Sequence, residues 1–183
     1  SIKDWDEKVD EICKETINEN MTTIGGIPPW IQMYFEKLLT KSKKKKITEV
    51  FENLTLYVHG GVNFAPYEKV FHRLIGKHID TIEYYPASEG FFAYQNSQKD
   101  NGLLLQYNSG IFYEFIKTNE FESGKYTRHN LSNVKTGVNY ILIVTSNAGL
   151  WAYNTGDTVK FVSLNPPKIL VTGRYKHFIS AFG

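Results

Sequence analysis

The hydrophobic pattern of the chain changes near Glu89, and this change constrains the fold more than any other feature. Before that residue, helical and strand patterns alternate. After it, short apolar runs are separated by turn sequences, as in antiparallel sheets. We therefore predict an α/β fold, with a mixed sheet and flanking helices followed by a mostly antiparallel β lobe. The two parts are predicted to be residues 1–96 and 97–183 of one domain.

Two helices are predicted at the start of the chain. In residues 4–20, Asp4 and Glu7 form a capping-box pair, and apolar residues recur at the spacing of one helical face. A connection rich in glycine and proline follows over residues 22–29. Because proline is tolerated in the first turn of a helix, the second helix is predicted to begin near Pro29.

The next segments have the order strand, helix, strand. Apolar runs at residues 54–58 and 79–85 flank a helical pattern at about residues 66–74. A unit of this kind places its two strands in parallel. The later strands are predicted at residues 91–94, 103–107, 111–116, 138–145, 150–153, 158–162 and 169–172.

Turn sequences separate these later strands. Asn-Gly at 101–102, Ser-Gly at 109–110 and Asn-Ala-Gly at 147–149 are typical of hairpins. Residues 119–137 are polar and predict a loop with at most one helical turn. Strands joined by hairpins pair antiparallel, so this pattern predicts antiparallel pairing for most of the second half.

The composition argues against several functional classes. Apolar residues make up 42% of the chain, which is typical of a globular protein, and the net charge of +2 gives no support for binding nucleic acid or a membrane. The single cysteine, Cys13, rules out an internal disulfide, and its place on the apolar face of the first helix predicts inert burial. No apolar run approaches the roughly 20 residues of a membrane span, and no signal-peptide pattern is found. We predict a cytoplasmic protein.

Two segments of the first half carry candidate binding residues. Gly60 and Gly61 follow a predicted strand and precede a helix, where glycine lets the backbone approach a ligand and where α/β sheets bind their ligands. In the next segment the Glu89 carboxylate suits Mg²⁺, the Ser88 hydroxyl suits a phosphate oxygen, and the Tyr85 ring suits a purine. Taken singly, each segment is also explained by an ordinary turn.

Two segments of the second half complete the set. Asp157 follows a predicted strand and a glycine turn, and a fixed carboxylate accepts hydrogen bonds from both hydroxyls of a ribose. Arg174 closes the last predicted strand, and its rigid fork of donors suits a phosphate or a ribose. The alternatives are an ordinary hairpin turn at Asp157 and a surface basic cluster at Arg174.

Other catalytic arrangements are absent from the sequence. The five histidines show no metal-ligand spacing, and one cysteine cannot build a zinc site. There is no Gly-X-Ser-X-Gly elbow, no Walker phosphate loop and no Gly-X-Gly-X-X-Gly dinucleotide motif. The four segments above are therefore the candidates for chemistry in this chain.

Taken in order, the segments resemble the acyl acid amido synthetases of the auxin-responsive promoter family, which belong to the adenylate-forming superfamily with acyl-CoA synthetases and firefly luciferase. Ile-Pro-Pro-Trp-Ile-Gln at 27–32 resembles the family's helix start, and residues 60–62 resemble the superfamily's adenine-binding strand end. Tyr-Pro-Ala-Ser-Glu-Gly at 85–90 resembles its second nucleotide motif. Tyr-Asn-Thr-Gly-Asp at 153–157 resembles the Tyr-Arg-X-Gly-Asp motif, and residues 173–179 resemble the segment before the interdomain hinge.

The resemblance implies an ATP-dependent ligase. A small carboxylic acid attacks the α-phosphate of ATP, with Mg²⁺ as cofactor, and gives an acyl adenylate and pyrophosphate. An amine, commonly an amino acid, then attacks the acyl carbon and AMP leaves. Such chemistry depends on orienting the reactants and neutralising phosphate charge more than on a covalent enzyme group.

The resemblance also implies a role for each matching residue. Glu89 helps to bind Mg²⁺, Asp157 binds the ribose hydroxyls, and Arg174 contacts the ribose or the α-phosphate. Glu89 and Arg174 are therefore the catalytic candidates, and Phe92 is implied to form a wall of the acyl pocket. The residues implied to line the nucleotide are Gly60, Gly61, Val62, Tyr85, Ala87 and Ser88, together with Asp157 and Arg174.

Three departures limit the resemblance. Asn154 replaces the arginine of the family motif. The family's phosphate loop is absent, and so is its small C-terminal domain with an assisting lysine. We therefore expect an internal fragment of the large N-terminal domain, inactive alone and ending at the interdomain hinge, whose partners include the missing N-terminal and C-terminal parts of the same protein. A non-catalytic nucleotide-binding or interaction module is the alternative.

Overall fold

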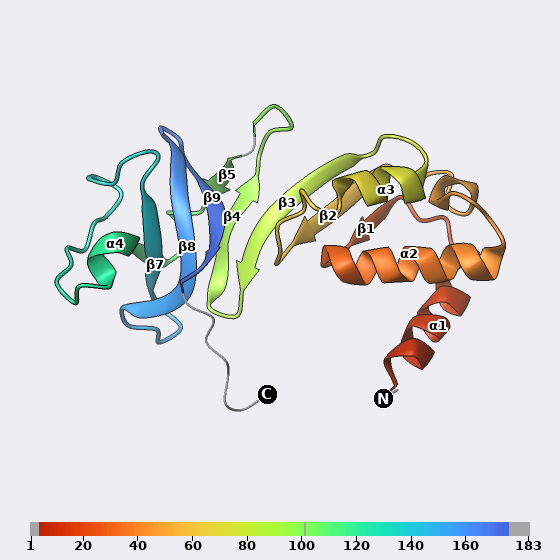
Figure 1. Ribbon diagram of the computed structural model, residues 1–183, viewed down its shortest axis with the longest axis horizontal. Helices are drawn as coiled ribbons and strands as arrows, with labels where there is room; N and C mark the ends of the chain where they lie inside the picture. Colours follow the sequence, from red (N-terminus) through yellow and green to blue (C-terminus); the bar gives the residue numbers. More distant parts are fainter. Residues whose placement is uncertain (1–3, 101, 176–183) are drawn as a thin grey trace. The chain divides into compact units, whose positions relative to one another are not determined.

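The computed structural model describes residues 4–100 and 102–175, which fall into two compact units with a boundary between Tyr84 and Tyr85. The fold is mixed α/β, as the sequence predicted: helices and parallel strands form the first unit, and antiparallel strands form most of the second (Figure 1). The division of one domain at residue 96, made from the change in hydrophobic pattern, stays a prediction.

The first unit contains a three-stranded parallel arrangement in the order β1-β2-β3. The predicted strand–helix–strand unit is confirmed as β2-α3-β3. The strand β1 was not predicted, because its residues stand in the glycine- and proline-rich connection. The elements are α1 (Trp5–Thr16), β1 (Thr23–Gly25), α2 (Pro28–Ser42), a short 3-10 helix (Ile47–Glu49), β2 (Leu56–Gly60), α3 (Glu68–Ile75) and β3 (Asp80–Ala87).

Aromatic and aliphatic side chains from the helices and β2 form the core of the first unit. Phe35 of α2 and Phe71 of α3 are buried, and the Phe71 ring stacks on Tyr57 of β2 with 4.9 Å between ring centres. Cys13 is a fully buried free cysteine, which confirms its predicted burial, and burial raises the pKa of its thiol. The buried side chains of α2 and α3 therefore pack these two helices against the strands.

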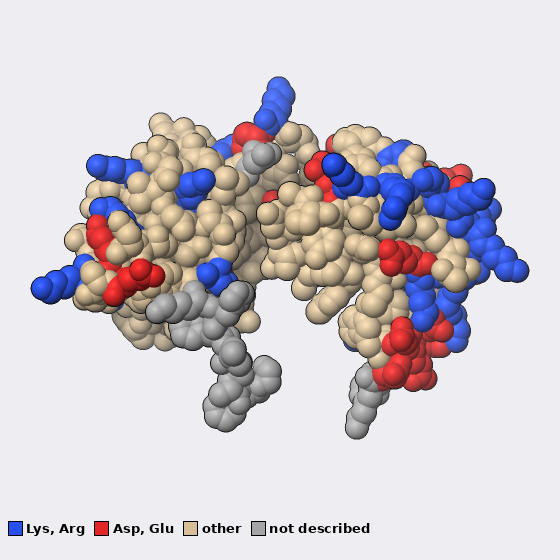
Figure 2. Space-filling view, viewed as in Figure 1, with Lys and Arg blue, Asp and Glu red and all other residues tan. Residues whose placement is uncertain are grey.

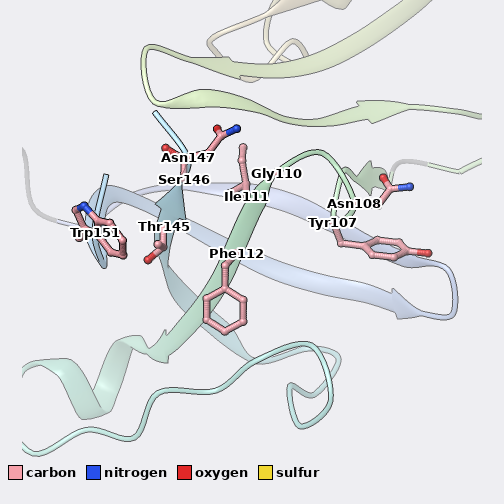
Figure 3. A pocket seen from close by; sticks show the side chains of 9 residues that line it. All are labelled: Tyr107, Asn108, Gly110, Ile111, Phe112, Thr145, Ser146, Asn147 and Trp151. Atoms are coloured by element: carbon pink, nitrogen blue, oxygen red, sulfur yellow. The ribbon is translucent and has the colours of Figure 1, made fainter. Parts of the chain in front are cut away.

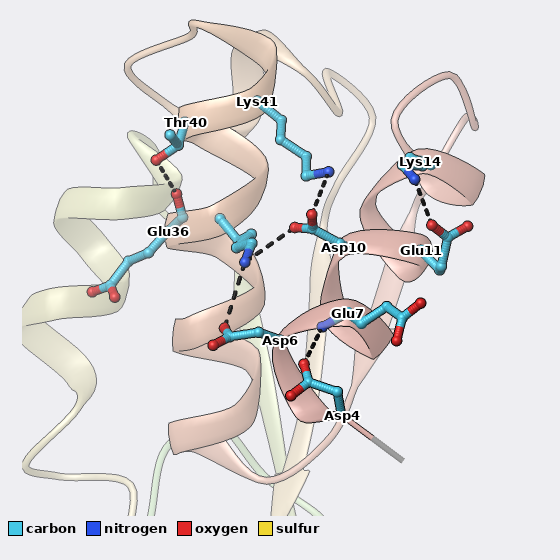
Figure 4. A network of polar contacts seen from close by, with 10 residues as sticks. Asp4, Asp6, Glu7, Asp10, Glu11, Lys14, Glu36, Thr40 and Lys41 are labelled. Carbon is cyan, nitrogen blue, oxygen red and sulfur yellow. Dashed lines mark hydrogen bonds and ion pairs between the residues drawn. The ribbon is translucent and has the colours of Figure 1, made fainter. Parts of the chain in front are cut away.

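Polar contacts fix the start of α1 and its approach to α2 (Figure 4). The Asp4 carboxylate accepts a hydrogen bond of 2.8 Å from the backbone N–H of Glu7, so Asp4 caps the helix as predicted. Across the two helices, the Lys37 ammonium lies 3.1 Å from Asp10 and 3.5 Å from Asp6. The neighbouring Lys37 holds the pKa of the Asp10 carboxyl below its usual range.

Removing the cap of α1 tests this local assignment. Replacing Asp4 by alanine is expected to lower the free energy of unfolding by about 1 kcal/mol, because one N-terminal backbone donor loses its acceptor. Asp6→Ala is the matched control, since Asp6 lies in the same first turn but caps nothing and should cost less than about 0.5 kcal/mol. Urea denaturation of both variants measures the difference, and equal effects would contradict the capping role.

In the described residues of the second unit, the end of β3 is followed by six strands in the order β4-β5-β9-β8-β7-β6, and each neighbouring pair among these six is antiparallel. The predicted antiparallel character of the second half is thus confirmed. One short helix interrupts the long polar loop, again as predicted. The elements are β4 (Gly90–Gln95), β5 (Leu103–Leu105), β6 (Ile111–Lys117), α4 (Thr118–Phe121), β7 (Asn139–Ser146), β8 (Tyr153–Leu164) and β9 (Pro167–Arg174).

Two predictions about this sheet are wrong in detail. The segments 150–153 and 158–162 were predicted as separate strands, but one continuous strand, β8, runs from Tyr153 to Leu164. The turn at 109–110 joins β5 to β6, which pair with other strands and not with each other. The hairpin at 147–149 is confirmed by the pairing of β7 with β8, whereas the predicted turn at 101–102 includes a residue outside the described part.

Aromatic residues fill the core of the second unit. Phe115 of β6 and Phe161 of β8 are fully buried, with 5.0 Å between their ring centres, and Tyr140 of β7 packs against both. The neighbour of Phe161 along the strand, Val162, is 43% exposed. This alternation is expected where one face of a sheet is buried and the other is solvated.

Basic and acidic side chains are interspersed over the face of each unit seen in Figure 2. Within the described ranges, none of the helices is long and apolar enough to cross a membrane. Several charged side chains of the second unit form pairs of opposite sign, such as Lys168 with Asp100 at 2.9 Å and Arg128 with Glu114 at 3.0 Å. Exposed pairs of this kind contribute little to stability, typically below about 1 kcal/mol each.

Candidate nucleotide site

A bulge in β8 sets the position of Asp157. Between the register pairs Ile141–Thr158 and Ile143–Asn154, three residues of β8 lie opposite one residue of β7. Gly156 in this bulge has a φ of 77°, a conformation that only glycine adopts at little cost. Asp157 was predicted to lie in a turn after a strand, but it lies inside the strand β8. A bulge of this kind re-aims the side chain that follows it.

Side chains on either side of Gly156 stabilise the bulge. The Asn154 side-chain oxygen accepts a hydrogen bond of 2.9 Å from the Gly156 N–H. The Thr155 hydroxyl donates to the Leu142 carbonyl at 3.0 Å and accepts from the Asp157 N–H at 3.2 Å. Asn154, the residue that departs from the family motif, thus has a structural role here, since it satisfies a backbone donor that the bulge removes from the sheet.

Both oxygens of the Asp157 carboxylate accept a hydrogen bond. Tyr85 donates its hydroxyl to Oδ2 at 2.5 Å, and Arg174 donates Nε–H to Oδ1 at 3.0 Å. Asp157 and Arg174 are register partners on β8 and β9, so the sheet itself places their side chains together. Asp157 is only 8% exposed, whereas the Arg174 side chain is 62% exposed. The structure therefore brings three of the predicted site residues into one cluster.

Tyr85 is held firmly in this cluster. Its side chain is buried, and its ring packs edge-on against Phe92 with 5.1 Å between ring centres. Burial, assisted by the hydrogen bond to Asp157, raises the pKa of the Tyr85 phenol far above its usual range. The phenol therefore stays protonated at any ordinary pH and acts as a donor to the carboxylate.

The predicted Ser-Glu-Gly turn is present. Ser88 and Glu89 form the turn between β3 and β4, with Ser88 exposed and Glu89 half-buried, while Ala87 ends β3. The charge of Glu89 contributes a small part of the rise in the Tyr85 pKa, so the turn lies within electrostatic reach of the cluster. Phe92 is fully buried in the core of the second unit, and its predicted place in an acyl pocket stays a prediction.

The predicted adenine segment lies in the first unit. Gly60 ends β2, next to the carboxyl end of β1, and Gly61 and Val62 follow as exposed residues. Gly61 has a φ of 83°, which favours glycine at this position. The segment leaves the sheet at the carboxyl ends of parallel strands, the usual place for ligands in α/β folds.

A pocket that the sequence did not predict opens on the second unit (Figure 3). It has a volume of about 510 Å³ and lies where β6 and the β7–β8 connection meet. None of the predicted site residues lines it. Its lining residues are Tyr107, Asn108, Gly110, Ile111, Phe112, Thr145, Ser146, Asn147 and Trp151. Three of its aromatic side chains are more than half exposed, Trp151 most of all at 81%.

A pre-built metal centre is not found in the described ranges, since no three His, Cys, Asp or Glu side chains gather there. Glu89 is a single carboxylate in a turn. This donor set fits Mg²⁺ bound together with a substrate's phosphates, because Mg²⁺ keeps several waters and takes only one or two protein carboxylates.

The described fold matches solved adenylate-forming enzymes. The structure titled "GH3.15 acyl acid amido synthetase" aligns over 96% of this chain with a TM-score of 0.69 and 14% identity, and the same enzyme "in complex with 2,4-DB" aligns with a TM-score of 0.71. A 2-hydroxyisobutyryl-CoA ligase aligns over 92% of this chain with a TM-score of 0.61 and 12% identity. These matches confirm that the chain has part of the large-domain fold of adenylate-forming enzymes.

A match to a known protein family covers only part of the second unit. Residues 104–174 match the GH3 family central domain, which confirms the resemblance to acyl acid amido synthetases in this part of the chain. The matched residues include Asp157 and Arg174. The chain spans 41% of the length of the acyl acid amido synthetase and 38% of the length of the CoA ligase.

Proposed function

We propose that this chain supplies nucleotide-binding residues to an ATP-dependent ligase that activates a carboxylic acid as an acyl adenylate and then joins it to an amine or amino acid. The observation that supports this most is the Tyr85–Asp157–Arg174 cluster, which contains a carboxylate with both oxygens held in place. It coincides with the motif that resembles the family's ribose-binding sequence and lies partly within the matched family domain.

Asp157 would bind the ribose of ATP. A carboxylate has about four acceptor positions, and Tyr85 and Arg174 use two of them. Two positions are left for the 2′- and 3′-hydroxyls of a ribose. Hydrogen bonds to a charged acceptor contribute about 1.5–3 kcal/mol, so this contact would provide a large share of the affinity for a nucleoside.

Arg174 and Glu89 would act on the phosphates. Arg174 uses only Nε on Asp157, so its remaining guanidinium N–H groups are available to an α-phosphate, whose charge grows as the carboxylic acid attacks. Glu89 would hold Mg²⁺, which when bound neutralises phosphate charge. Ala87 and Ser88 would line the adenine, and Phe92 would line the acyl group.

The proposed reaction has two balanced steps. A carboxylate oxygen of the acid forms a bond to the α-phosphorus, and the bond from that phosphorus to the bridging oxygen breaks, releasing pyrophosphate. The amine nitrogen then forms a bond to the acyl carbon, AMP leaves with the bonding electrons, and the amine loses a proton to solvent. Groups that orient the reactants and neutralise phosphate charge provide much of the acceleration in reactions of this type. The acid and the amine are not specified by the residues described.

Titration calorimetry of the complete natural protein with ATP and Mg²⁺ tests the nucleotide site. Asp157→Ala is expected to weaken ATP binding by about 10–100-fold, and Glu89→Ala is expected to weaken it only when Mg²⁺ is present. Asp100→Ala is the matched control, because Asp100 also pairs with a cation of β9 and lies outside the proposed site. Unchanged affinity in both site variants would overturn the assignment. Binding of ATP without pyrophosphate release by the wild type would favour a non-catalytic nucleotide-binding module.

A further inference from the structure

We propose that Tyr85 is a positioning residue whose hydroxyl holds the Asp157 carboxylate in the orientation that accepts the two ribose hydroxyls. This inference rests on the proposed function and adds to it a role through Asp157, separate from the packing of the Tyr85 ring on a purine. It predicts that the preference of the protein for a ribose over a dideoxyribose depends on a hydroxyl that does not touch the nucleotide.

The geometry of the carboxylate carries the argument. Tyr85 binds Oδ2 and Arg174 binds Oδ1, so the two donors fix the plane of the carboxylate from both of its oxygens. The Arg174 side chain is 62% exposed, and a long exposed side chain is a weak anchor because holding it costs rotamer entropy. The firm anchor is therefore Tyr85.

The surroundings of Tyr85 leave its hydroxyl little freedom. The side chain is 7% exposed and its ring packs on Phe92 in the core of the second unit. A tyrosine has only two side-chain torsions ahead of the ring, and both are fixed when the ring is packed. Because burial keeps the phenol protonated, it can serve as a donor throughout the catalytic pH range. The Tyr85 hydroxyl is therefore in position to donate before a nucleotide binds.

Without the Tyr85 hydroxyl, the Asp157 carboxylate would keep a hydrogen bond only to the exposed side chain of Arg174. In a Tyr85→Phe variant the ring still fills its place, but Oδ2 of Asp157 loses its donor and the carboxylate can turn toward Arg174. One ribose hydroxyl then meets a poorly placed acceptor. The loss concerns only ligands that carry these hydroxyls, so a general weakening of the fold would not reproduce it.

The test compares the affinities of the complete natural protein for ATP and for 2′,3′-dideoxy-ATP by calorimetry. In the wild type, ATP is expected to bind more tightly, and Tyr85→Phe is expected to reduce this preference about ten-fold by weakening ATP binding alone. Tyr113→Phe is the matched control, since Tyr113 is a buried tyrosine of the same core whose hydroxyl donates to the Gln106 carbonyl at 3.2 Å. It should leave the preference unchanged.

The outcomes separate the two proposals. If Tyr85→Phe keeps the wild-type preference for ATP over 2′,3′-dideoxy-ATP, the positioning role is overturned and the proposed function is unaffected. The same conclusion follows if Tyr113→Phe loses as much of this preference as Tyr85→Phe. A wild type with no preference for ATP overturns the ribose role of Asp157 and the positioning role with it. A measurement on the wild type covers the case in which Tyr85→Phe does not fold. The Tyr85 hydroxyl proton, followed by NMR with selectively labelled tyrosine, should stay hydrogen-bonded when ATP binds, and its release would overturn the inference.

Discussion

Replacing Phe161 by alanine is expected to lower the free energy of unfolding of the second unit by about 3–5 kcal/mol. Phe161 is fully buried in β8 and packs against Phe115 and Tyr140 of two other strands. Truncating it removes apolar contacts and leaves a cavity that the sheet cannot close, because its strands are fixed by backbone hydrogen bonds on both sides. Total stabilities of about 5–15 kcal/mol are usual, so this change would remove a large share.

The neighbouring residue provides the control. Val162 follows Phe161 along β8 and is 43% exposed, so Val162→Ala should change the free energy of unfolding by less than about 0.5 kcal/mol. Urea denaturation followed through the amide NMR signals of β7 and β8 measures the unfolding of the second unit. Similar losses in both variants would mean that the inward and outward faces of β8 are not as described.

The strand that contains both residues was predictable from the sequence, whereas the burial of Phe161 and the exposure of Val162 were not. Residues 158–162 were predicted as a strand, and β8 contains them. The start of α1 was equally predictable, since Asp4 and Glu7 carry the capping chemistry in their own side chains. The parallel unit β2-α3-β3 followed from the order and length of its apolar runs. In each case the signal lies in residues close together along the chain.

The errors arose where tertiary pairing outweighs local propensity. β1 contains only three residues, beside Gly26 and Pro28, and forms because the edge of β2 offers it backbone partners. The break predicted around Gly156 is instead a bulge, since neighbouring strands on both sides keep β8 continuous. The turn at 109–110 leads to a strand at the far end of the sheet, because the order of strands is set by long-range packing and not by the turn alone.

In the candidate site, too, the residue types were predictable from the sequence, whereas their contacts depend on tertiary pairing. The residue types at Asp157 and Arg174 could be identified from motif order, but their contact with each other depends on the register of β8 and β9. The bond from Tyr85 to Asp157 joins residues 72 positions apart and has no local signal. The assignment of Asn154 to the bulge also required coordinates, because in the sequence it reads only as a departure from the family motif.

A buried histidine in the first unit has a different consequence, which concerns pH. His59 of β2 is 2% exposed and packs against the rings of Tyr57 and Phe64, at 5.2 and 4.3 Å between ring centres. Its Nδ1 is buried and makes no hydrogen bond within the described part of the chain. Burial lowers the pKa of His59 to about 4, because the charged imidazolium would lose its hydration among apolar rings.

Stability of the first unit is therefore expected to fall as the solution becomes acidic. The unfolded chain takes up a proton at His59 near the ordinary pKa of about 6.5, whereas the folded chain resists it until about pH 4. Above pH 6.5 both states are neutral at this residue and there is no penalty. Between about pH 6.5 and 4 the unfolded state binds more protons, so stability is lost, and below about pH 4 the loss levels off. The full contribution is on the order of 3 kcal/mol.

His59→Phe isolates this contribution, because phenylalanine keeps an aromatic ring in contact with Tyr57 and Phe64 and removes the titrating group together with the unpaired buried nitrogen. The variant should lose clearly less stability than the wild type between pH 7 and pH 4.5, measured as urea midpoints of the amide signals of β1 and β2. His72→Gln is the control, since His72 is an exposed histidine of the same unit, and it should follow the wild type. If His59→Phe also follows the wild type, the folded chain takes up a proton at His59 over the same pH range as the unfolded chain. That result would exclude a lowered pKa for the buried His59.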